Sequence, residues 1–343
     1  MSKVNRIEWV DLLKGIAILW LIVYHMHVFE WMRSPVPVFF FLSGLFFSED
    51  ISFGSFVRKK AKALLVPLAF FFVLGVAASA LKCLIQGEAY SFPPLWLFAT
   101  LIPADAEITN PLGVGAIWFL VSLFEIYIIY YALRRVSKNR WWLLSAAVLL
   151  FLISCVALHY YAHGSLFYLF YTFGFCIYFI VAHLLRDKVL HGSVPAWLFS
   201  MAIAAYCIRF VQVPDRLLNS GMGGVILMRL KGLVSMSGVI IVAIWLCQQL
   251  VSIKHVTSMR TYAFLLFEGR NSLTILGVHM LIMGVAAILL KRFMTAGVLY
   301  DIFLFLIIVV FSNLCVVLFN HYVPFLVNHQ ADKSNEEKIR KSI

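Results

Sequence analysis

The sequence predicts an all-α, polytopic integral membrane protein with about ten transmembrane helices and both termini in the cytoplasm. Three observations support this. Of the 343 residues, 63% are hydrophobic and only 13% are charged, a composition that soluble domains of this length do not have. Apolar runs long enough to cross a bilayer recur from end to end. The basic residues cluster between these runs, as expected of cytoplasmic loops.

The predicted spans follow the apolar runs of the sequence. The second begins beside Pro35 and Pro37, so we expect it to be tilted or broken. Residues 1–328 are predicted to form a single transmembrane domain and residues 329–343 a short polar tail. The ten spans are expected near 9–30, 36–48, 63–85, 113–133, 141–160, 165–185, 195–210, 224–250, 268–290 and 299–322.

Orientation follows from the basic residues. With ten spans, the basic stretches at the N-terminus, 58–62, 134–140, 186–188 and 254–260 and in the C-terminal tail all lie on one side, which is then the cytoplasmic side. Two pairs do not fit: Arg229 with Lys231, and Lys291 with Arg292. The net charge of +12 indicates cytoplasmic loops and contact with anionic membrane lipids, and we expect no nucleic-acid partner.

Some classes of site are not expected. The six cysteines are scattered singly without a C-x-x-C pair, which is typical of small buried side chains rather than disulfides or metal ligands. The histidines also lack metal-ligand spacing, so we predict no metal. The first apolar segment carries Asp11 and Lys14 and has no A-x-A cleavage site, so we expect it to remain as the first transmembrane helix.

Lys14 and His25 are the leading candidates for chemistry, because ionisable residues inside a membrane usually mark a working site. Eleven residues span about three helical turns, so the two share a face about 16 Å apart along the axis. Asp11 lies one turn before Lys14 on the same stripe. A neutral imidazole at depth can act as a base. The alternatives are a structural histidine and a lysine that snorkels to the membrane surface.

Other polar residues inside apolar runs are candidates for the same site. Glu125 lies well inside the span 113–133, at a depth where it could meet His25; a structural pairing with Arg229 or Lys231 is the alternative. Trp118 lies on nearly the same face as Glu125. Ser43, followed by a glycine, allows close helix approach. Ser272 and His279 share one face near the start of the ninth span.

Lys59 and Lys62 belong to the basic run RKKAK at 58–62. Alone, this run is explained as a positive-inside anchor. Together with Lys14, it could line a phosphate-binding mouth on the cytoplasmic side. We refer to Lys14, Lys59 and Lys62 as the donor lysines.

The ordered set of motifs resembles the membrane-bound acyltransferase-3 family. The segment DLLKGIAILWLIVYH is similar to the family's D-x-L-[RK]-G opening with a basic residue, ten residues and a histidine. PVFFFLSGLFF resembles its F-F-F-x-S-G segment, FVRKKAKALLVP its R-x-x-R entry to the third helix, WFLVSLF its W-F-L segment, and GRNSLTILGVH its late G-x-x-S-L motif with a following histidine. Lysine replaces the family's arginine at 14, 59 and 62, which weakens a bidentate grip on phosphate.

The resemblance implies acyl transfer, usually of acetyl, from cytoplasmic acyl-coenzyme A to a carbohydrate hydroxyl, often on an envelope or exported glycan. It implies that His25 is the catalytic residue and that the donor lysines bind acetyl-CoA, with no tightly bound cofactor. We therefore expect a multi-pass protein of a bacterial inner membrane. The alternative is a proton-coupled secondary transporter in which His25, Glu125 and His279 form a proton relay; against it, the sequence shows no internal repeat. The acceptor and the oligomeric state are not specified.

Overall fold

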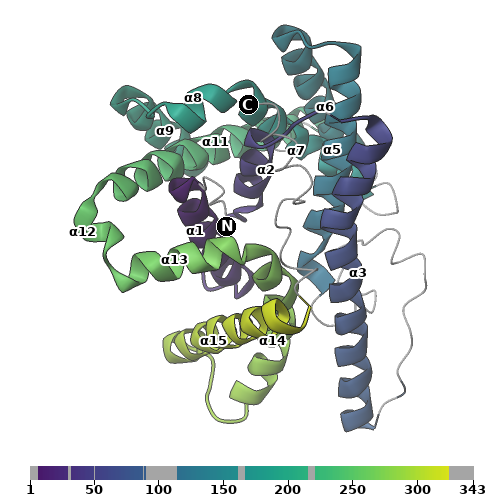
Figure 1. Ribbon diagram of the computed structural model, residues 1–343, viewed down its shortest axis with the longest axis vertical. Coiled ribbons are helices and arrows are strands. Elements are labelled where there is room, and N and C mark those ends of the chain that lie inside the picture. The colour runs from purple at the N-terminus through teal and green to yellow at the C-terminus, as the bar shows by residue number, and fades with distance from the viewer. Residues whose placement is uncertain are drawn as a thin grey trace, which may run out of the picture. The chain divides into compact units, whose positions relative to one another are not determined.

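The structure is a computed structural model, and it describes residues 7–29, 32–49, 51–87, 89, 114–160, 167–214 and 221–323. Every regular element in these ranges is a helix (Figure 1). The predicted polar tail 329–343 lies outside the described residues. The helices are α1 (Glu8–His25), α2 (Val36–Leu45), α3 (Phe53–Gln86), η1 (Val114–Ala116), α5 (Trp118–Val136), α6 (Arg140–Tyr160), α7 (Phe167–Leu184), α8 (Arg186–His191), α9 (Ala196–Cys207), η2 (Ile208–Phe210), α11 (Met222–Ser252), α12 (Lys254–Thr257), α13 (Arg260–Arg270), α14 (Ser272–Leu290) and α15 (Val298–Tyr322).

Each of the ten predicted ranges overlaps at least one of these helices. Within the described ranges, five helices are long and apolar enough to cross a membrane: Phe53–Leu84, Arg140–Tyr160, Met222–Ser252, Ser272–Leu290 and Val298–Tyr322. Shorter apolar helices lie at Val36–Leu45, Leu169–Leu184 and Ala196–Phe210. The chain is therefore an all-α, multi-pass membrane protein, while the count of ten spans and the cytoplasmic termini stay predictions.

Several helix boundaries differ from the predicted ones, and three of the differences bear on the predicted site residues and the predicted helix breaks. Helix α3 begins at Phe53, so Lys59 and Lys62 lie in its first turns and not in a loop. Helix α2 begins at Val36 with Pro37 in its first turn, where the missing N–H of proline does no harm, so the prolines start this helix and do not break it. The predicted span 268–290 is divided at Asn271, which separates α13 from α14.

The chain forms two compact units. Unit 1 comprises Met1–Phe56 and Ser122–Arg270, and unit 2 comprises Val57–Val121 and Asn271–Ile343. In unit 1, α7 packs on α6 and α2, α9 packs on α11, and α1 packs on α13, α11 and α2. In unit 2, α14 packs on α15 and on η1. Gly277 of α14 meets the ring of Phe71 from α3, so a side chain at 277 would collide with that ring.

An aromatic core centred on Phe47 holds α2, α5 and α7 of unit 1 together. The Phe47 ring contacts those of Tyr130 at 4.7 Å, Phe56 at 5.7 Å and Phe179 at 5.9 Å between centroids. All four side chains are buried, and edge-to-face pairs of this kind stabilise beyond the area they bury. On α2, Gly44 lies against the Phe179 carbonyl. The predicted close approach at Ser43-Gly44 is therefore confirmed.

Candidate functional site

Helix α1 carries both leading candidates. Lys14 and His25 lie on this one continuous helix, Glu8–His25, and both are half-buried. Their spacing places them about 16 Å apart along the axis and on nearly the same face. One helix therefore presents an ammonium near its N-terminal end and an imidazole at its C-terminal end.

The helix ends at His25, five residues earlier than the predicted span 9–30. His27 has φ 54°, in the left-handed region that non-glycine residues seldom occupy, and this turn stops the helix. His25 therefore lies in the last turn, where the helix dipole stabilises a positive charge. An imidazole that accepts a proton here gains that stabilisation.

Helix α13 packs against the first half of α1 at two glycines. A Cβ built on Gly15 would collide with the Leu265 carbonyl, and one on Gly269 with the Asp11 carbonyl. The two glycines face each other, because the Cβ position of each also lies within 3.2 Å of the backbone nitrogen of the other. Such close backbone approach requires glycine on both helices.

Two polar contacts flank these glycines. The Arg270 Nε donates to Asp11 Oδ2 at 3.3 Å, and the Tyr262 hydroxyl donates to Glu8 Oε2 at 3.1 Å. Burial and the bond to Glu8 raise the pKa of Tyr262 to about 12, so the phenol stays protonated. Asp11, a predicted site residue, thus holds the side chain of Arg270.

Arg270 is a candidate functional residue that the sequence motifs did not single out. Its side chain is 41% exposed, so it remains accessible while Asp11 orients it. Helical geometry places Lys14 within one turn of Asp11, at about 5–6 Å between Cβ atoms. Arg270 therefore adds a second cation beside Lys14. The signal in the sequence was the basic residue in GRNSL, which spacing alone could not link to α1.

Glu125 lies on α5 and forms a hydrogen bond to α7. Thr172 Oγ1 lies 2.7 Å from Glu125 Oε2 and 2.8 Å from Ser122 Oγ. A hydroxyl carries one proton, so Thr172 donates to the carboxylate and accepts from Ser122. Lys231, one of the alternative partners, donates instead to the Val211 carbonyl at 2.6 Å. The contact between Glu125 and His25 stays a prediction.

Ser43 contributes through its main chain, because its carbonyl accepts a 3.5 Å hydrogen bond from the Tyr127 hydroxyl. This bond ties α2 to α5 within unit 1. A role for the Ser43 hydroxyl in the site stays a prediction.

The remaining predicted residues belong to unit 2. Lys59 and Lys62 are exposed on one face of the start of α3. Trp118 is the first residue of α5 and is half-buried, and Ser272 is the first residue of α14. His279 is fully buried, and its Nδ1 lies 3.0 Å from the carbonyls of Ile275 and Leu276. Since carbonyls only accept, Nδ1 carries the proton and Nε2 is the acceptor of the ring.

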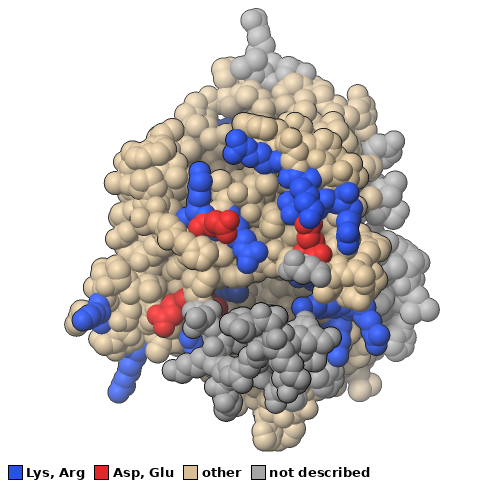
Figure 2. Space-filling model, turned by 45° about the horizontal axis from the view of Figure 1, so that its top comes forward, with Lys and Arg blue, Asp and Glu red and all other residues tan. Residues whose placement is uncertain are grey.

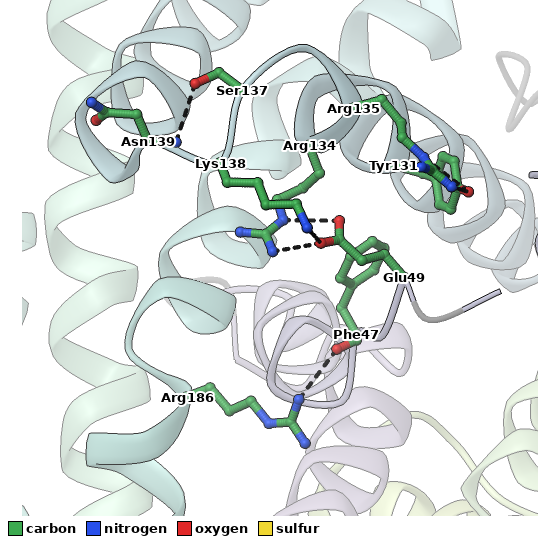
Figure 3. Close-up of polar contacts among 9 residues, drawn as sticks. All are labelled: Phe47, Glu49, Tyr131, Arg134, Arg135, Ser137, Lys138, Asn139 and Arg186. Carbon is green, nitrogen blue, oxygen red and sulfur yellow. Dashed lines mark hydrogen bonds and ion pairs between the residues drawn. The ribbon is translucent and has the colours of Figure 1, made fainter. Parts of the chain in front are cut away.

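A basic cluster surrounds Glu49, beyond the end of α2 (Figure 3). Arg134 donates two hydrogen bonds to its carboxylate, at 2.7 and 3.0 Å, and Lys138 lies 3.0 Å away. Arg186 donates to the Phe47 carbonyl at 3.4 Å. The hydrogen bond from Arg134 lowers the pKa of Glu49 to about 2. The sequence indicated only that these cations are loop charges, whereas in the structure Arg134 and Arg186 bind α5 and the start of α8 to the segment that follows α2.

Charged side chains and possible metal ligands are considered next, over the described ranges. In Figure 2, Lys and Arg side chains are spread over the visible face, and Asp and Glu side chains lie among them. Within residues that the structure describes, no group of His, Cys, Asp and Glu side chains is arranged to hold a metal ion.

Comparison with known proteins supplies a family match. A family model described as an acyltransferase domain matches residues 7–319. This range includes every predicted site residue from Asp11 to His279. Neither the curated proteins nor the solved structures gave a match.

Proposed function

This chain belongs to the acyltransferase-3 family and is a membrane acyltransferase, and on that premise we propose that it moves an acetyl group from acetyl-coenzyme A to a carbohydrate hydroxyl. The acceptor is a cell-surface or exported glycan or its precursor. The enzyme acts in a bacterial inner membrane.

The observation that carries the proposal is the arrangement of α1. This helix holds Lys14 and His25 about 16 Å apart on one face, and Asp11 orients Arg270 beside Lys14. An acyl donor with phosphates at one end and a reactive thioester at the other suits a site that separates cations from a proton acceptor in this way.

His25 performs the proton chemistry. In the direct route, its imidazole takes the proton of the acceptor hydroxyl while the oxygen attacks the thioester carbonyl. The carbon–sulfur bond then breaks and the thiolate of coenzyme A leaves. In the alternative route, the imidazole nitrogen attacks first and briefly carries the acetyl group before the hydroxyl takes it. In both routes the C-terminal end of α1 stabilises the charged imidazole.

The donor lysines bind the phosphates of acetyl-CoA, and Arg270 adds a fork-shaped cation to Lys14. Charge-assisted bonds from cations to phosphate are among the stronger hydrogen bonds in proteins. Glu125, held by Thr172, orients the imidazole of His25. Trp118, Ser272 and His279 support the acceptor.

The test is transfer of radiolabelled acetyl from acetyl-CoA to glycans in proteoliposomes. His25→Ala abolishes transfer while expression and thermal stability stay near wild type, and transfer by the wild type falls at low pH, where a protonated imidazole can no longer act as a base. The matched control is His27→Asn, because His27 is exposed and asparagine tolerates its left-handed backbone. Activity of His25→Ala within about threefold of wild type would refute its catalytic role. Solute flux without acetyl transfer would instead indicate a proton-coupled transporter.

A further inference from the structure

The short turn between α5 and α6 gathers four basic residues of unit 1. Only residues 137–139 separate the two helices. Two hydrogen bonds fix the turn, one from the Asn139 main-chain nitrogen to Ser137 Oγ at 3.1 Å and one from the Trp141 main-chain nitrogen to Asn139 Oδ1 at 2.8 Å. We give the name turn cations to the basic residues of the turn and of the helix ends beside it, which are Arg134, Arg135, Lys138 and Arg140.

The acid that contacts the turn cations does not balance their charge. Arg134 and Lys138 share a single carboxylate, that of Glu49 (Figure 3). The Lys138 side chain is also 73% exposed, so its ammonium can meet a second anion. Arg135 and Arg140 are exposed, and neither forms an ion pair with any residue that the structure describes. The turn therefore carries a surplus of positive charge on the surface.

Arg135 is held in place by a tyrosine. Its Nε and Nη2 both donate to the Tyr131 hydroxyl oxygen, and that hydroxyl donates its own proton to the Ile51 carbonyl at 3.0 Å. The Tyr131 ring packs against those of Phe53 and Phe56, at 5.3 and 4.7 Å between centroids. A guanidinium has five N–H groups. Tyr131 takes two of them, so a positioned cation offers the other three to a ligand.

Exposed apolar side chains lie next to these charges. Val136 ends α5 and Trp141 lies in the first turn of α6, and they are 74% and 65% exposed. The Arg140 guanidinium lies over the Trp141 ring, 5.1 Å from its centroid. Helix α6 is long and apolar enough to cross a membrane. Tryptophan and basic residues at the end of such a helix are typical of the membrane–water interface, so the turn lies at the level of the lipid headgroups.

We propose that the turn cations bind the phosphate of an anionic lipid headgroup, with Val136 and Trp141 against the lipid. A lipid of net negative charge complements the surplus of positive charge, whereas a zwitterionic lipid carries a cationic group of its own. Guanidinium groups form charge-assisted hydrogen bonds with phosphate. The ligand is a lipid and not a soluble phosphate, because exposed apolar side chains flank the cations at the end of a membrane-crossing helix.

The test measures lipid binding without acyl transfer, so it does not depend on the proposed function. Native mass spectrometry follows the full chain in detergent while phosphatidylglycerol, or phosphatidylcholine with the same acyl chains, is added. Each titration is run with and without saturating coenzyme A. One cation near an anionic lipid surface contributes a factor of about five in affinity. We therefore expect phosphatidylglycerol to bind at least about fivefold more tightly than phosphatidylcholine, with or without coenzyme A.

The double variant Arg135→Gln, Arg140→Gln should lower the affinity for phosphatidylglycerol at least about fivefold and bring it close to that for phosphatidylcholine. The matched control is Lys254→Gln, Arg260→Gln, which makes the same change of charge at two exposed residues of α12 and α13 and should change the affinity less than about twofold, because salt screens distant charges. Tyr131→Phe keeps all the turn cations but releases Arg135, so the affinity should fall at least about twofold.

Three results would overturn the proposal. The first is equal binding of the two lipids by the wild type. The second is an equal loss in the two double variants, which would show diffuse attraction without a site. The third is loss of phosphatidylglycerol binding when coenzyme A is added, which would assign the turn cations to the donor. If the double variant does not fold, the single variant Arg140→Gln at an exposed position decides, with an expected loss of about fivefold.

Discussion

Replacing Gly269 by alanine tests whether the contact between α1 and α13 positions the donor site. An ideal Cβ at 269 would collide with the Asp11 carbonyl oxygen and would lie 2.8 Å from the Gly15 nitrogen. Ordinary van der Waals contact begins at 3.4 Å, so the helices must separate locally by at least about 0.6 Å for the nitrogen, and by more for the oxygen, to accept the methyl group. Both colliding groups are backbone atoms, which cannot rotate away as a flexible side chain would.

The separation has two consequences. Overpacking of this kind typically destabilises by about 1–3 kcal/mol. It also lengthens the contact between Arg270 and Asp11, now 3.3 Å, beyond hydrogen-bonding distance and displaces Arg270 from Lys14. A misplacement of about 1 Å at a binding group can reduce activity by about 100-fold. We therefore expect Gly269→Ala to lower both the midpoint of thermal unfolding and the rate of acetyl transfer.

The matched control is Gly232→Ala. Gly232 lies inside α11, and nothing lies within 4 Å of the position that an added methyl group would take, so alanine should stabilise this helix by about 0.5–1 kcal/mol. Both variants are measured by thermal unfolding in the same detergent and by radiolabelled acetyl transfer. If Gly269→Ala proves at least as stable and as active as Gly232→Ala, the close contact does not position the site.

Three further predictions follow from the other contacts. Replacing the donor lysines by glutamine should raise the KM for acetyl-CoA at least tenfold and change the KM for the acceptor little. Replacing all three by arginine should keep or improve the affinity for acetyl-CoA. If the glutamine variant binds acetyl-CoA normally but inserts poorly into the membrane, the donor lysines serve only as a topology anchor. Glu125→Gln should reduce kcat much more than stability and should add little further loss of activity in a His25→Ala background. Additive losses in this double-mutant comparison would show that the two residues act independently. Thr172→Val, which removes the hydrogen-bond donor to Glu125, should reproduce part of the loss in kcat. The folded-state pKa of Glu49, about 2 against an ordinary 4.5, means that its ion pair with Arg134 stabilises the protein fully above a pH of about 5 and loses this effect as the pH falls towards 2. The unfolding free-energy difference between wild type and Glu49→Gln should therefore shrink over that range, and a difference independent of pH would contradict the pairing.

Local properties of the sequence determined the class of the protein and the positions of its helices. Each of the ten predicted ranges overlaps a helix because a long apolar run between basic residues leaves the backbone few other ways to satisfy its hydrogen bonds in lipid. The placement of Lys14 and His25 on one face of one helix was equally local, since helical periodicity alone sets it. Even the close packing at Gly44 followed from small residues in an apolar run.

Contacts between distant parts of the chain were decided only by the tertiary structure. Arg270 and Asp11 are 259 positions apart in the sequence, and no periodicity links them. The division of the predicted span 268–290 at Asn271 was likewise visible only in the structure. The same holds for the pairing of Glu49 with Arg134 and for the bond from Thr172 to Glu125. The sequence shows which residues are charged and on which helix they lie, but the partner of each charge depends on which helix faces meet, and that is decided by packing across the whole unit.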